Sequence, residues 1–499
     1  MKRGAAKKLV WIWAWSALAA CATAEPGVKP GPAPYLNAKA DAKPDAKPDA
    51  KPDAKPEPPK AEPDPLGPQD ASLIPDDVRA SLQARLDAGE NEAIIVGVIT
   101  PEGHAFHALG RSGAPNGQLD PTTLFEIGSV TKLFTALLLQ EMVRAGEVGL
   151  DDPLSSLLPE GQVAPSKNKK EITLKHLVSH CSGLPRVAPH KPQDPNNPYA
   201  DFGEAALLEF LKGHELVREP GAGYEYSNLG MGLLGYALSR KAGLGYEPLL
   251  VSRVLRPLGM GSTLVSLGEP EKARMAQGHV EGKPVPAWDF AALPGAGALR
   301  STAWDLLWFV GRYVRGEAGP LQQSLQDIAQ PMRDSDHSGV KVGMGWHLAE
   351  RDEKQVLFHS GGTGGQSSFV GFNPKTKRGV VVLTNSSAQV DDLGLHLLES
   401  ALPLRVVEKP LALPEATLAR YVGRYELAPE FHLQVTLEEG RLWVQATGQP
   451  KFPIYARTEQ EFFLKVVDAR VVFQLDPKEK VTGLVLHQSG RSPFGKKVE

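Results

Sequence analysis

The stretch Leu124-Phe-Glu-Ile-Gly-Ser-Val-Thr-Lys-Leu-Phe-Thr135 holds a Ser-x-x-Lys pair, Ser129 and Lys132, at the start of an apolar run. Residues three positions apart lie on one face of a helix, so the Lys132 amine can reach the Ser129 hydroxyl. A hydroxyl is a poor nucleophile until a base takes its proton, and a desolvated lysine has a lowered pKa and can be that base. The apolar run predicts a buried helix over about 129–145. We therefore predict Ser129 as a nucleophile and Lys132 as its base.

The Ser-x-x-Lys spacing is weak evidence by itself, because about one chance match is expected in a chain of this length. A second match, Ser166 to Lys169, lies in a polar segment that no apolar helix follows. The surrounding sequence therefore favours Ser129 over Ser166.

A second motif, Tyr226-Ser-Asn228, adds groups that acyl transfer needs. A phenol beside a lysine amine can shuttle protons, and an asparagine amide can orient a substrate amide. We therefore expect Tyr226 to work with Lys132, and Asn228 to bind the substrate.

A third motif, His359-Ser-Gly-Gly-Thr-Gly364, follows a predicted strand over 355–358. Its glycines let a substrate approach the strand backbone closely. The N–H of Gly362 can pair with that of Ser129 to hold an oxyanion. A similar segment, His337-Ser-Gly339, lacks the glycine run and is set aside.

In order and spacing, these three motifs resemble those of the penicillin-binding-protein and β-lactamase-like serine hydrolases, nearest to the class C β-lactamase branch. The likeness covers about residues 75–405 and includes His176-Leu-Val-Ser-His-Cys-Ser-Gly-Leu-Pro185. It implies an α/β fold, in which an antiparallel sheet is flanked by helices and by a helical subdomain. It also implies an acyl-enzyme at Ser129, with Lys132 and Tyr226 sharing the general base and acid work. No cofactor is implied, and substrate binding falls to Asn228, His359, Gly361 and Gly362.

One position departs from the family pattern. The third motif of the family usually opens with lysine, which meets the substrate carboxylate, whereas this chain has His359. Histidine has an unperturbed pKa near 6.5, so it is mostly neutral at pH 7 and a permanent cation is lost. Related esterases and peptidases that act on D-amino acids also carry histidine here. The resemblance therefore favours a D-alanyl-D-alanine-type carboxypeptidase or peptidase of cell-wall peptides. An esterase, a weak β-lactamase and a non-catalytic penicillin-binding or cell-wall-binding receptor stay open as alternatives.

The N-terminus predicts export and lipid anchoring. Residues 1–20 are basic and then apolar, which is typical of a signal peptide. Cys21 follows Leu18-Ala-Ala, which resembles a bacterial lipobox, and Ala22 in place of aspartate indicates outer-membrane delivery. Residues 21–70 include four tandem Asp-Ala-Lys-Pro units, whose composition predicts a disordered tether. The chain is thus expected to be periplasmic and membrane-associated through lipid on Cys21.

The remaining chain divides by composition into two parts. Residues 71–405 form the predicted hydrolase domain, which opens with a buried strand over 92–100 and its hairpin partner over 104–109. Residues 414–499 alternate apolar and polar positions between turns, which predicts a small all-β barrel or sandwich. The formal net charge is −3, so nothing favours a nucleic-acid partner.

Several other polar residues have simpler interpretations. His176 and His180 have the i, i+4 spacing of zinc ligands, but no third ligand is evident, and we expect them to close a helix. Cys181 is expected to be buried and structural. Arg300 is expected to position a loop, and Ser301-Thr302 to cap a helix that begins near Ala303.

Overall fold

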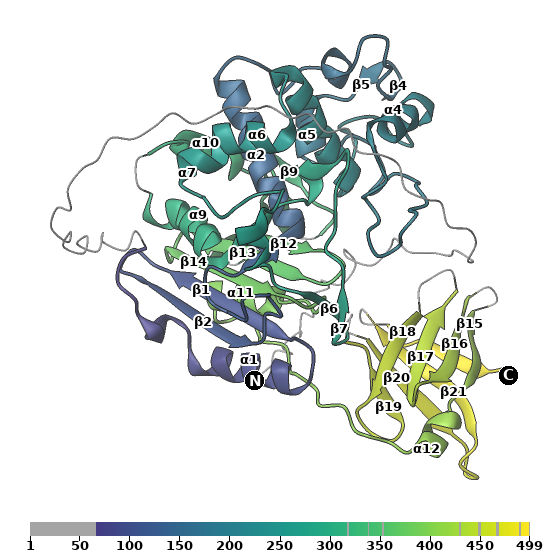
Figure 1. Ribbon diagram of the computed structural model, residues 1–499. Helices are drawn as coiled ribbons and strands as arrows, with labels where there is room; N and C mark the ends of the chain where they lie inside the picture. Colours follow the sequence, from purple (N-terminus) through teal and green to yellow (C-terminus); the bar gives the residue numbers. More distant parts are fainter. Residues whose placement is uncertain are drawn as a thin grey trace, which may run out of the picture.

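An eight-stranded antiparallel sheet is the centre of the larger part of the molecule (Figure 1). The computed structural model describes residues 66–316, 319–337, 339–351, 354–428, 431–447, 451–465, 469–488 and 491–498. Along the sheet the strand order is β2-β1-β14-β13-β12-β11-β10-β9. The strands are β1 (Ala93–Ile99), β2 (His104–Gly110), β9 (Arg333–Asp334), β10 (Val340–Val342), β11 (His347–Arg351), β12 (Lys354–Gly362), β13 (Ser367–Asn373) and β14 (Arg378–Thr384). The predicted first hairpin is confirmed as the β1–β2 pair.

Both faces of this sheet are covered by helices, because its central strands are apolar on both sides. On β1, Ile94, Val96 and Val98 pack with α1 (Asp76–Asp87) and α11 (Asp391–Leu398). Ile95 and Ile99 belong to the larger core on the opposite face. This arrangement confirms the predicted α/β fold with an antiparallel sheet between helices.

The larger core is built around α2 (Thr131–Arg144), whose residues 131–140 are all buried. The predicted helix over 129–145 therefore exists, but its α-helical part begins two residues later than expected. Gly128, Ser129 and Val130 instead form a 3-10 turn, in which Gly128 has a left-handed φ of 47° that an α-helix does not allow. The other helices are α3 (Leu174–Val178), α4 (Glu204–Gly213), α5 (Asn228–Ala242), α6 (Tyr246–Leu250), α7 (Arg256–Leu258), α8 (Glu269–Lys272), α9 (Ala303–Arg315) and α10 (Gln322–Ile328).

Three two-stranded sheets lie outside the main sheet. The first pairs β3 (Leu124–Glu126), which leads into Ser129, with β8 (Arg300–Thr302), which leads into α9. The second pairs β4 (Ser166–Lys167) with β5 (Lys170–Glu171). The third, β6 (Gly278–Val280) with β7 (Lys283–Val285), projects toward the C-terminal part of the chain (Figure 1).

The C-terminal part is a closed eight-stranded barrel. Of the two predicted all-β forms, the barrel is therefore correct and the sandwich is not. It follows the short helix α12 (Glu415–Ala419). Apolar and aromatic side chains fill its interior, including Tyr421, Tyr425, Phe462 and Phe473. Its strands are β15 (Gly423–Ala428), β16 (Phe431–Glu438), β17 (Arg441–Ala446), β18 (Lys451–Ala456), β19 (Glu461–Phe463), β20 (Ala469–Leu475), β21 (Val481–Gln488) and β22 (Phe494–Lys497).

The predicted signal peptide over 1–20, the lipidation site Cys21 and most of the tether over 21–70 lie outside the described residues. Among the helices that the structure does describe, none has the length and apolar character needed to cross a bilayer.

Candidate active site

Ser129 and Lys132 face each other as the sequence predicts. The Lys132 Nζ lies 2.8 Å from the Ser129 Oγ and also donates to the carbonyl oxygen of Ala296 at 2.6 Å. The Lys132 side chain is fully buried. Burial, helped by the positive charge of Arg186, holds the pKa of Lys132 well below its usual value. A neutral Lys132 amine can therefore accept the Ser129 proton.

The backbone around Ser129 is pressed against the end of β12. A Cβ on Gly128 would stand 2.6 Å from the Gly362 oxygen and 2.7 Å from its nitrogen, closer than real Cβ atoms come. Only glycine can take this position, because the site combines a positive φ with backbone on the facing side. The predicted partners in an oxyanion hole, Ser129 and Gly362, are thus brought next to each other.

Tyr226 reaches Ser129 from a different part of the chain. Its hydroxyl lies next to Ser129, and burial raises the pKa of Tyr226 to about 12. The phenol therefore keeps its proton at neutral pH and can donate it. The Ser227 Oγ accepts the Gly230 N–H at 2.8 Å and so caps α5, which fixes Tyr226 immediately before the helix.

Asn228 is the first residue of α5 and lies beside Tyr226. Its side chain lies close to the Tyr199 hydroxyl. Its Oδ1 is buried and has no hydrogen-bond partner among the described residues. A buried acceptor of this kind is costly unless a ligand satisfies it, which suits the predicted contact with a substrate amide.

His359 and Gly361 lie near the end of β12. The His359 Nδ1 contacts the Ser360 oxygen at 2.7 Å, and its buried Nε2 meets no hydrogen-bond partner within the described part of the chain. Burial, together with nearby His347 and Lys132, holds the pKa of His359 well below its usual value. His359 is therefore neutral, and the cation that lysine would supply is missing, as the sequence predicts.

Comparison with known proteins agrees with this geometry. A family model described as Beta-lactamase matches residues 79–401. The chain belongs to this β-lactamase family. It is a serine hydrolase, since members of the β-lactamase family act through serine on amide or ester bonds. A second family model, a domain of unknown function called DUF3471, matches residues 408–498, which include the barrel.

Two relatives and two solved structures illustrate the β-lactamase family. Penicillin-binding protein 4* of Bacillus subtilis is 26% identical over 74% of this chain and 87% of its own. The D-alanyl-D-alanine-carboxypeptidase/endopeptidase AmpH of Escherichia coli is 28% identical over 58% of this chain and 78% of its own. The octameric penicillin-binding protein homologue from Pyrococcus abyssi has a TM-score of 0.58 at 21% identity, covering 84% of this chain and 99% of its own. A class C β-lactamase from Rhodobacter sphaeroides has a TM-score of 0.57 at 22% identity, covering 65% of this chain and 98% of its own. These two structures share the fold.

Within this β-lactamase-family site, the structure adds a cation that the sequence did not single out. The Arg186 guanidinium lies 4.9 Å from the centroid of the Tyr226 ring, and the Lys132 Nζ lies 5.1 Å from it. The Arg186 carbonyl oxygen also accepts the Asn228 N–H at 2.8 Å. Arg186 directly follows the family-like segment that ends at Pro185. This position next to a motif was the signal in the sequence that could have identified it.

Two histidines also surround Tyr226 unexpectedly. The His180 ring stacks on Tyr226 at 4.5 Å, and the His347 ring lies 6.4 Å away. The expectation that His176 and His180 close a helix is confirmed. The helix α3 ends at Val178 with His176 in its last turn, and His180, with a left-handed φ of 54°, closes it by donating its N–H to the Leu177 oxygen at 3.3 Å. His176 also takes part in the capping box at the N-terminus of this short helix. The described residues contain no group of three or more His, Cys, Asp or Glu side chains able to hold a metal ion.

A buried carboxylate ties the turn after β12 to a loop. Glu126 accepts the Thr363 hydroxyl at 2.8 Å and the Trp288 N–H at 2.7 Å, and burial raises its pKa. Arg300 donates to the Trp288 oxygen at 2.7 Å, which confirms its expected loop-positioning contact. The expected cap of the helix near Ala303 is also confirmed, because the Thr302 hydroxyl accepts the Asp305 N–H at 3.1 Å. Cys181 is buried, as expected.

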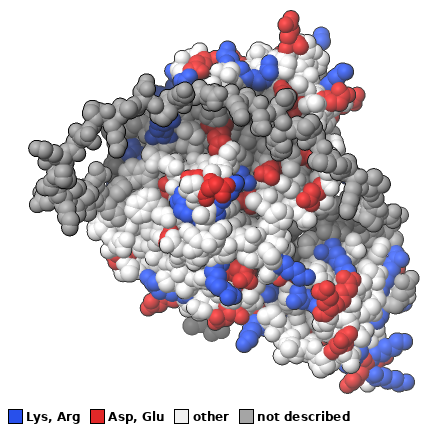
Figure 2. Space-filling view, viewed as in Figure 1, with Lys and Arg blue, Asp and Glu red and all other residues white. Residues whose placement is uncertain are grey.

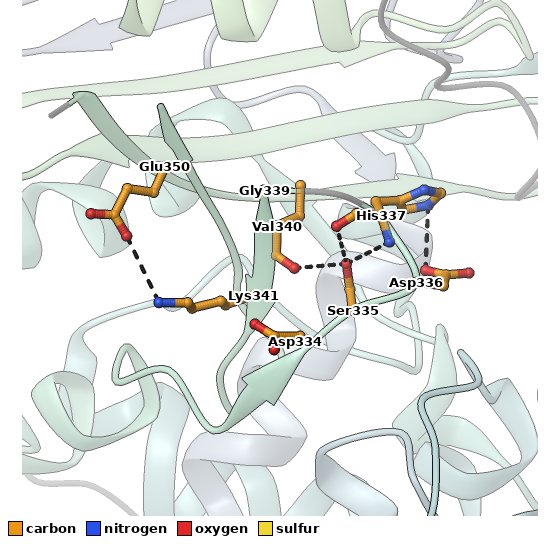
Figure 3. A pocket seen from close by; sticks show the side chains of 8 residues that line it. All are labelled: Asp334, Ser335, Asp336, His337, Gly339, Val340, Lys341 and Glu350. Atoms are coloured by element: carbon orange, nitrogen blue, oxygen red, sulfur yellow. Dashed lines mark hydrogen bonds and ion pairs between the residues drawn. The ribbon is translucent and has the colours of Figure 1, made fainter. Parts of the chain in front are cut away.

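A surface pocket at the outer strands of the sheet contains none of the motif residues (Figure 3). Its walls come from β9, β10, β11 and the intervening loop, which carries His337 of the third-motif look-alike. Lys341 and Glu350 form an ion pair across it at 3.9 Å, and the Ser335 hydroxyl donates to the Val340 oxygen at 2.8 Å. Its polar side chains largely pair with one another, so we do not assign the pocket to the candidate active site.

Replacing Arg186 by glutamine is expected to move the acid limb of the acylation rate to higher pH. Acylation needs neutral Lys132, so activity is lost as pH falls through the lowered pKa of Lys132. The Arg186 charge lies near Lys132 and lowers that pKa, so its removal raises the pKa. The neighbours Tyr226, His180, His347 and His359 stay neutral, because burial raises the phenol pKa and lowers those of the imidazoles.

The measurement is the labelling rate of Ser129 by a fluorophosphonate probe as a function of pH. Arg186→Lys keeps the charge and is expected to hold the acid limb near its original position. An unchanged acid limb in Arg186→Gln would show that Arg186 does not tune Lys132.

Proposed function

We propose that this serine hydrolase is a D-alanyl-D-alanine-type carboxypeptidase or peptidase of cell-wall peptides. The observation that carries the acyl-transfer chemistry is the 2.8 Å contact between Lys132 Nζ and Ser129 Oγ beside the Tyr226 phenol. Neutral His359 in place of a lysine favours a peptide over a β-lactam as substrate. The name of the relative AmpH, a D-alanyl-D-alanine-carboxypeptidase/endopeptidase, supports the same choice.

In the proposed mechanism, Lys132 takes the Ser129 proton as the Ser129 Oγ attacks the carbonyl carbon of the scissile amide. The N–H groups of Ser129 and Gly362 stabilise the negative charge on the carbonyl oxygen. Tyr226 donates its proton to the leaving amine and regains one from Lys132, while the carbon–nitrogen bond breaks. An acyl-enzyme ester and a free D-amino acid result. Water then attacks the ester, returns a proton to Ser129 and releases the shortened peptide, while Asn228 and His359 orient the substrate.

The test compares an N-acylated peptide that ends in D-Ala-D-Ala, its L-Ala-L-Ala counterpart, a short p-nitrophenyl ester and a chromogenic cephalosporin. We expect release of D-alanine from the first peptide, with kcat/KM at least about tenfold above those of the L-peptide and the cephalosporin. Ser129→Ala is the control and is expected to release none.

Other outcomes would replace the proposal by a named alternative. Preferential cephalosporin turnover would identify a β-lactamase, and turnover of the ester alone would identify an esterase. A fluorescent penicillin that labels Ser129 and never leaves, with no substrate turned over, would identify a receptor.

We also propose that the enzyme acts in the periplasm, anchored at the outer membrane by lipid on Cys21. The basic and apolar residues 1–20, the lipobox-like approach to Cys21 and the repeats within 21–70 support this location. Incorporation of labelled palmitate that persists in Cys21→Ala would disprove the anchor.

A further inference from the structure

The tip of the β6–β7 hairpin is held by the C-terminal barrel. Glu281, in the hairpin turn, accepts hydrogen bonds from the Arg441 Nη1 at 3.1 Å and the Tyr455 hydroxyl at 3.2 Å. The Arg441 guanidinium also lies 5.0 Å from the centroid of the Tyr455 ring. The Glu281 side chain is 26% exposed, so this is a partly desolvated ion pair rather than a fully solvated one.

The barrel has a second attachment to the hydrolase part. Arg405, in the segment that leads to the barrel, pairs with Glu90 at 2.5 Å, and the Glu90 side chain is only 1% exposed. The Lys465 Nζ of the barrel donates to the Ala88 oxygen at 3.0 Å. Charged side chains of both signs are interspersed over the face of the barrel that Figure 2 shows. At the hairpin, Lys283 and Glu439 also pair at 3.8 Å. The barrel is thus attached both at the hairpin and at Glu90, so it can act as a rigid support for the hairpin.

The base of the same hairpin is fixed to the turn that follows the third motif. The His279 N–H donates to the Gly365 oxygen at 3.0 Å and to the Asn385 oxygen at 2.9 Å. The turn continues directly from Gly361 and Gly362 and is closed by the Thr363 N–H bond to the Gln366 oxygen at 2.9 Å. Displacement of the hairpin would thus be transmitted to the rim of the candidate active site.

Residues 286–290, which we call the Trp288 loop, follow β7 along this rim. The Trp288 N–H donates to Glu126, three residues before Ser129. The indole packs on Gly364, where a Cβ would lie 2.5 Å from its Nε1. That Nε1 is buried and has no hydrogen-bond partner in the described ranges.

Tyr199 connects this donor to an unpartnered acceptor. The Tyr199 ring lies 5.5 Å from the Trp288 ring and stacks on Phe290 at 4.9 Å. Its hydroxyl lies close to the side chain of Asn228, whose buried Oδ1 is the unpartnered acceptor described above. A buried N–H donor and a buried C=O acceptor that both neighbour one aromatic residue are complementary to an amide group with an apolar neighbour.

We propose that the C-terminal barrel is a positioning domain: through Glu281 it holds the β6–β7 hairpin, and thereby the Trp288 loop, in place to bind an amide of the substrate's acyl part. The choice of substrate rests on the proposed function, whereas the positioning of the loop does not. The barrel thus acts on substrate recognition and not on the Ser129–Lys132 pair.

The first test measures loop order without any substrate. In the full chain, Arg441→Glu places two carboxylates against each other at the hairpin tip. We expect the amides of residues 287–290 to exchange deuterium about tenfold faster, with the amides of α2 unchanged. Combining Glu281→Arg with Arg441→Glu reverses the pair and is expected to restore slow exchange. Unchanged exchange over 287–290 in Arg441→Glu would overturn the proposal.

The second test separates loop positioning from general damage. Arg441→Glu is expected to raise KM for the D-Ala-D-Ala peptide by about tenfold, while kcat/KM for p-nitrophenyl acetate, whose acyl part has no amide for the Trp288 loop to bind, changes by less than about twofold. The matched control is Arg470→Glu. It makes the same charge change at an arginine whose partner at 3.3 Å, Glu461, is itself a residue of the barrel. Equal losses on both substrates, or equal effects of both variants, would overturn the proposal. If the wild-type protein leaves the peptide intact, the proposed function fails and the exchange measurement still decides this inference.

Discussion

Replacing Ser129 by alanine or Lys132 by arginine is expected to lower the rate of peptide hydrolysis by at least about 1,000-fold. Alanine removes the attacking oxygen. Arginine stays protonated where Lys132 is neutral, so no base remains within 2.8 Å of the Ser129 Oγ. Because the two side chains act as one unit, the double variant is expected to be no slower than the worse single variant.

The measurement is the steady-state rate with the D-Ala-D-Ala peptide, together with fluorophosphonate labelling and a thermal unfolding curve that shows each variant is folded. Ser166→Ala is the matched control, because it alters the other Ser-x-x-Lys match at an exposed residue of β4. It is expected to behave as the wild-type protein. A folded Lys132→Arg that kept more than about one tenth of the activity would remove Lys132 from the role of base.

The sequence predicted the residues of the candidate site that belong to short motifs with a recognisable spacing. Ser129, Lys132, Tyr226, Asn228 and the glycines after His359 come from three separate segments, and the fold brings them together. The alternation in the first hairpin and in the C-terminal strands also predicted their pairing, because a period of two is set locally by the pleat of a strand.

The residues that sequence reasoning missed act through contacts between distant segments. Trp288 meets Glu126 across 162 positions of sequence, and no local pattern marks either residue. His180 closes α3 as its sequence position predicted, whereas its packing on Tyr226 was not predicted. The start of α2 was predicted two residues too early for the same reason, because Gly128 takes a left-handed φ where its backbone packs against the distant Gly362.

The residues that the sequence did not reveal, such as Arg186, affect the protonation state of Lys132. Lys132 must stay neutral to act as a base, and a second lysine at position 359 would be another cation near it. Here the imidazoles of His180, His347 and His359 have lowered pKa values and are neutral, so Arg186 is the cation that acts directly on Lys132. A substrate carboxylate would thus meet a positive charge near Tyr226, at a position different from that of the family lysine.

Replacing Gly361 by alanine is expected to destabilise the hydrolase part by about 3 kcal/mol or more and to abolish acylation. A Cβ at Gly361 would lie far inside 3.0 Å of the Ile127 carbonyl oxygen, which is backbone and cannot swing away. That oxygen also accepts the Ser368 hydroxyl at 2.9 Å, so the new methyl group would separate β12 and β13 from the turn that carries Ser129.

The next residue, Gly362, has room for a Cβ where Gly361 has none. A Cβ on Gly362 would meet only the Gln366 oxygen, at 3.9 Å, so Gly362→Ala is expected to leave the melting temperature almost unchanged. Gly361→Ala is expected to lower it by about 5 °C or more, measured by thermal unfolding of the full chain. Labelling of Ser129 by fluorophosphonate should disappear in Gly361→Ala even below its melting temperature, because the displaced turn no longer presents the nucleophile. Equal melting temperatures for the two variants would mean that the close approach of β12 to Ile127 does not hold Ser129 in place.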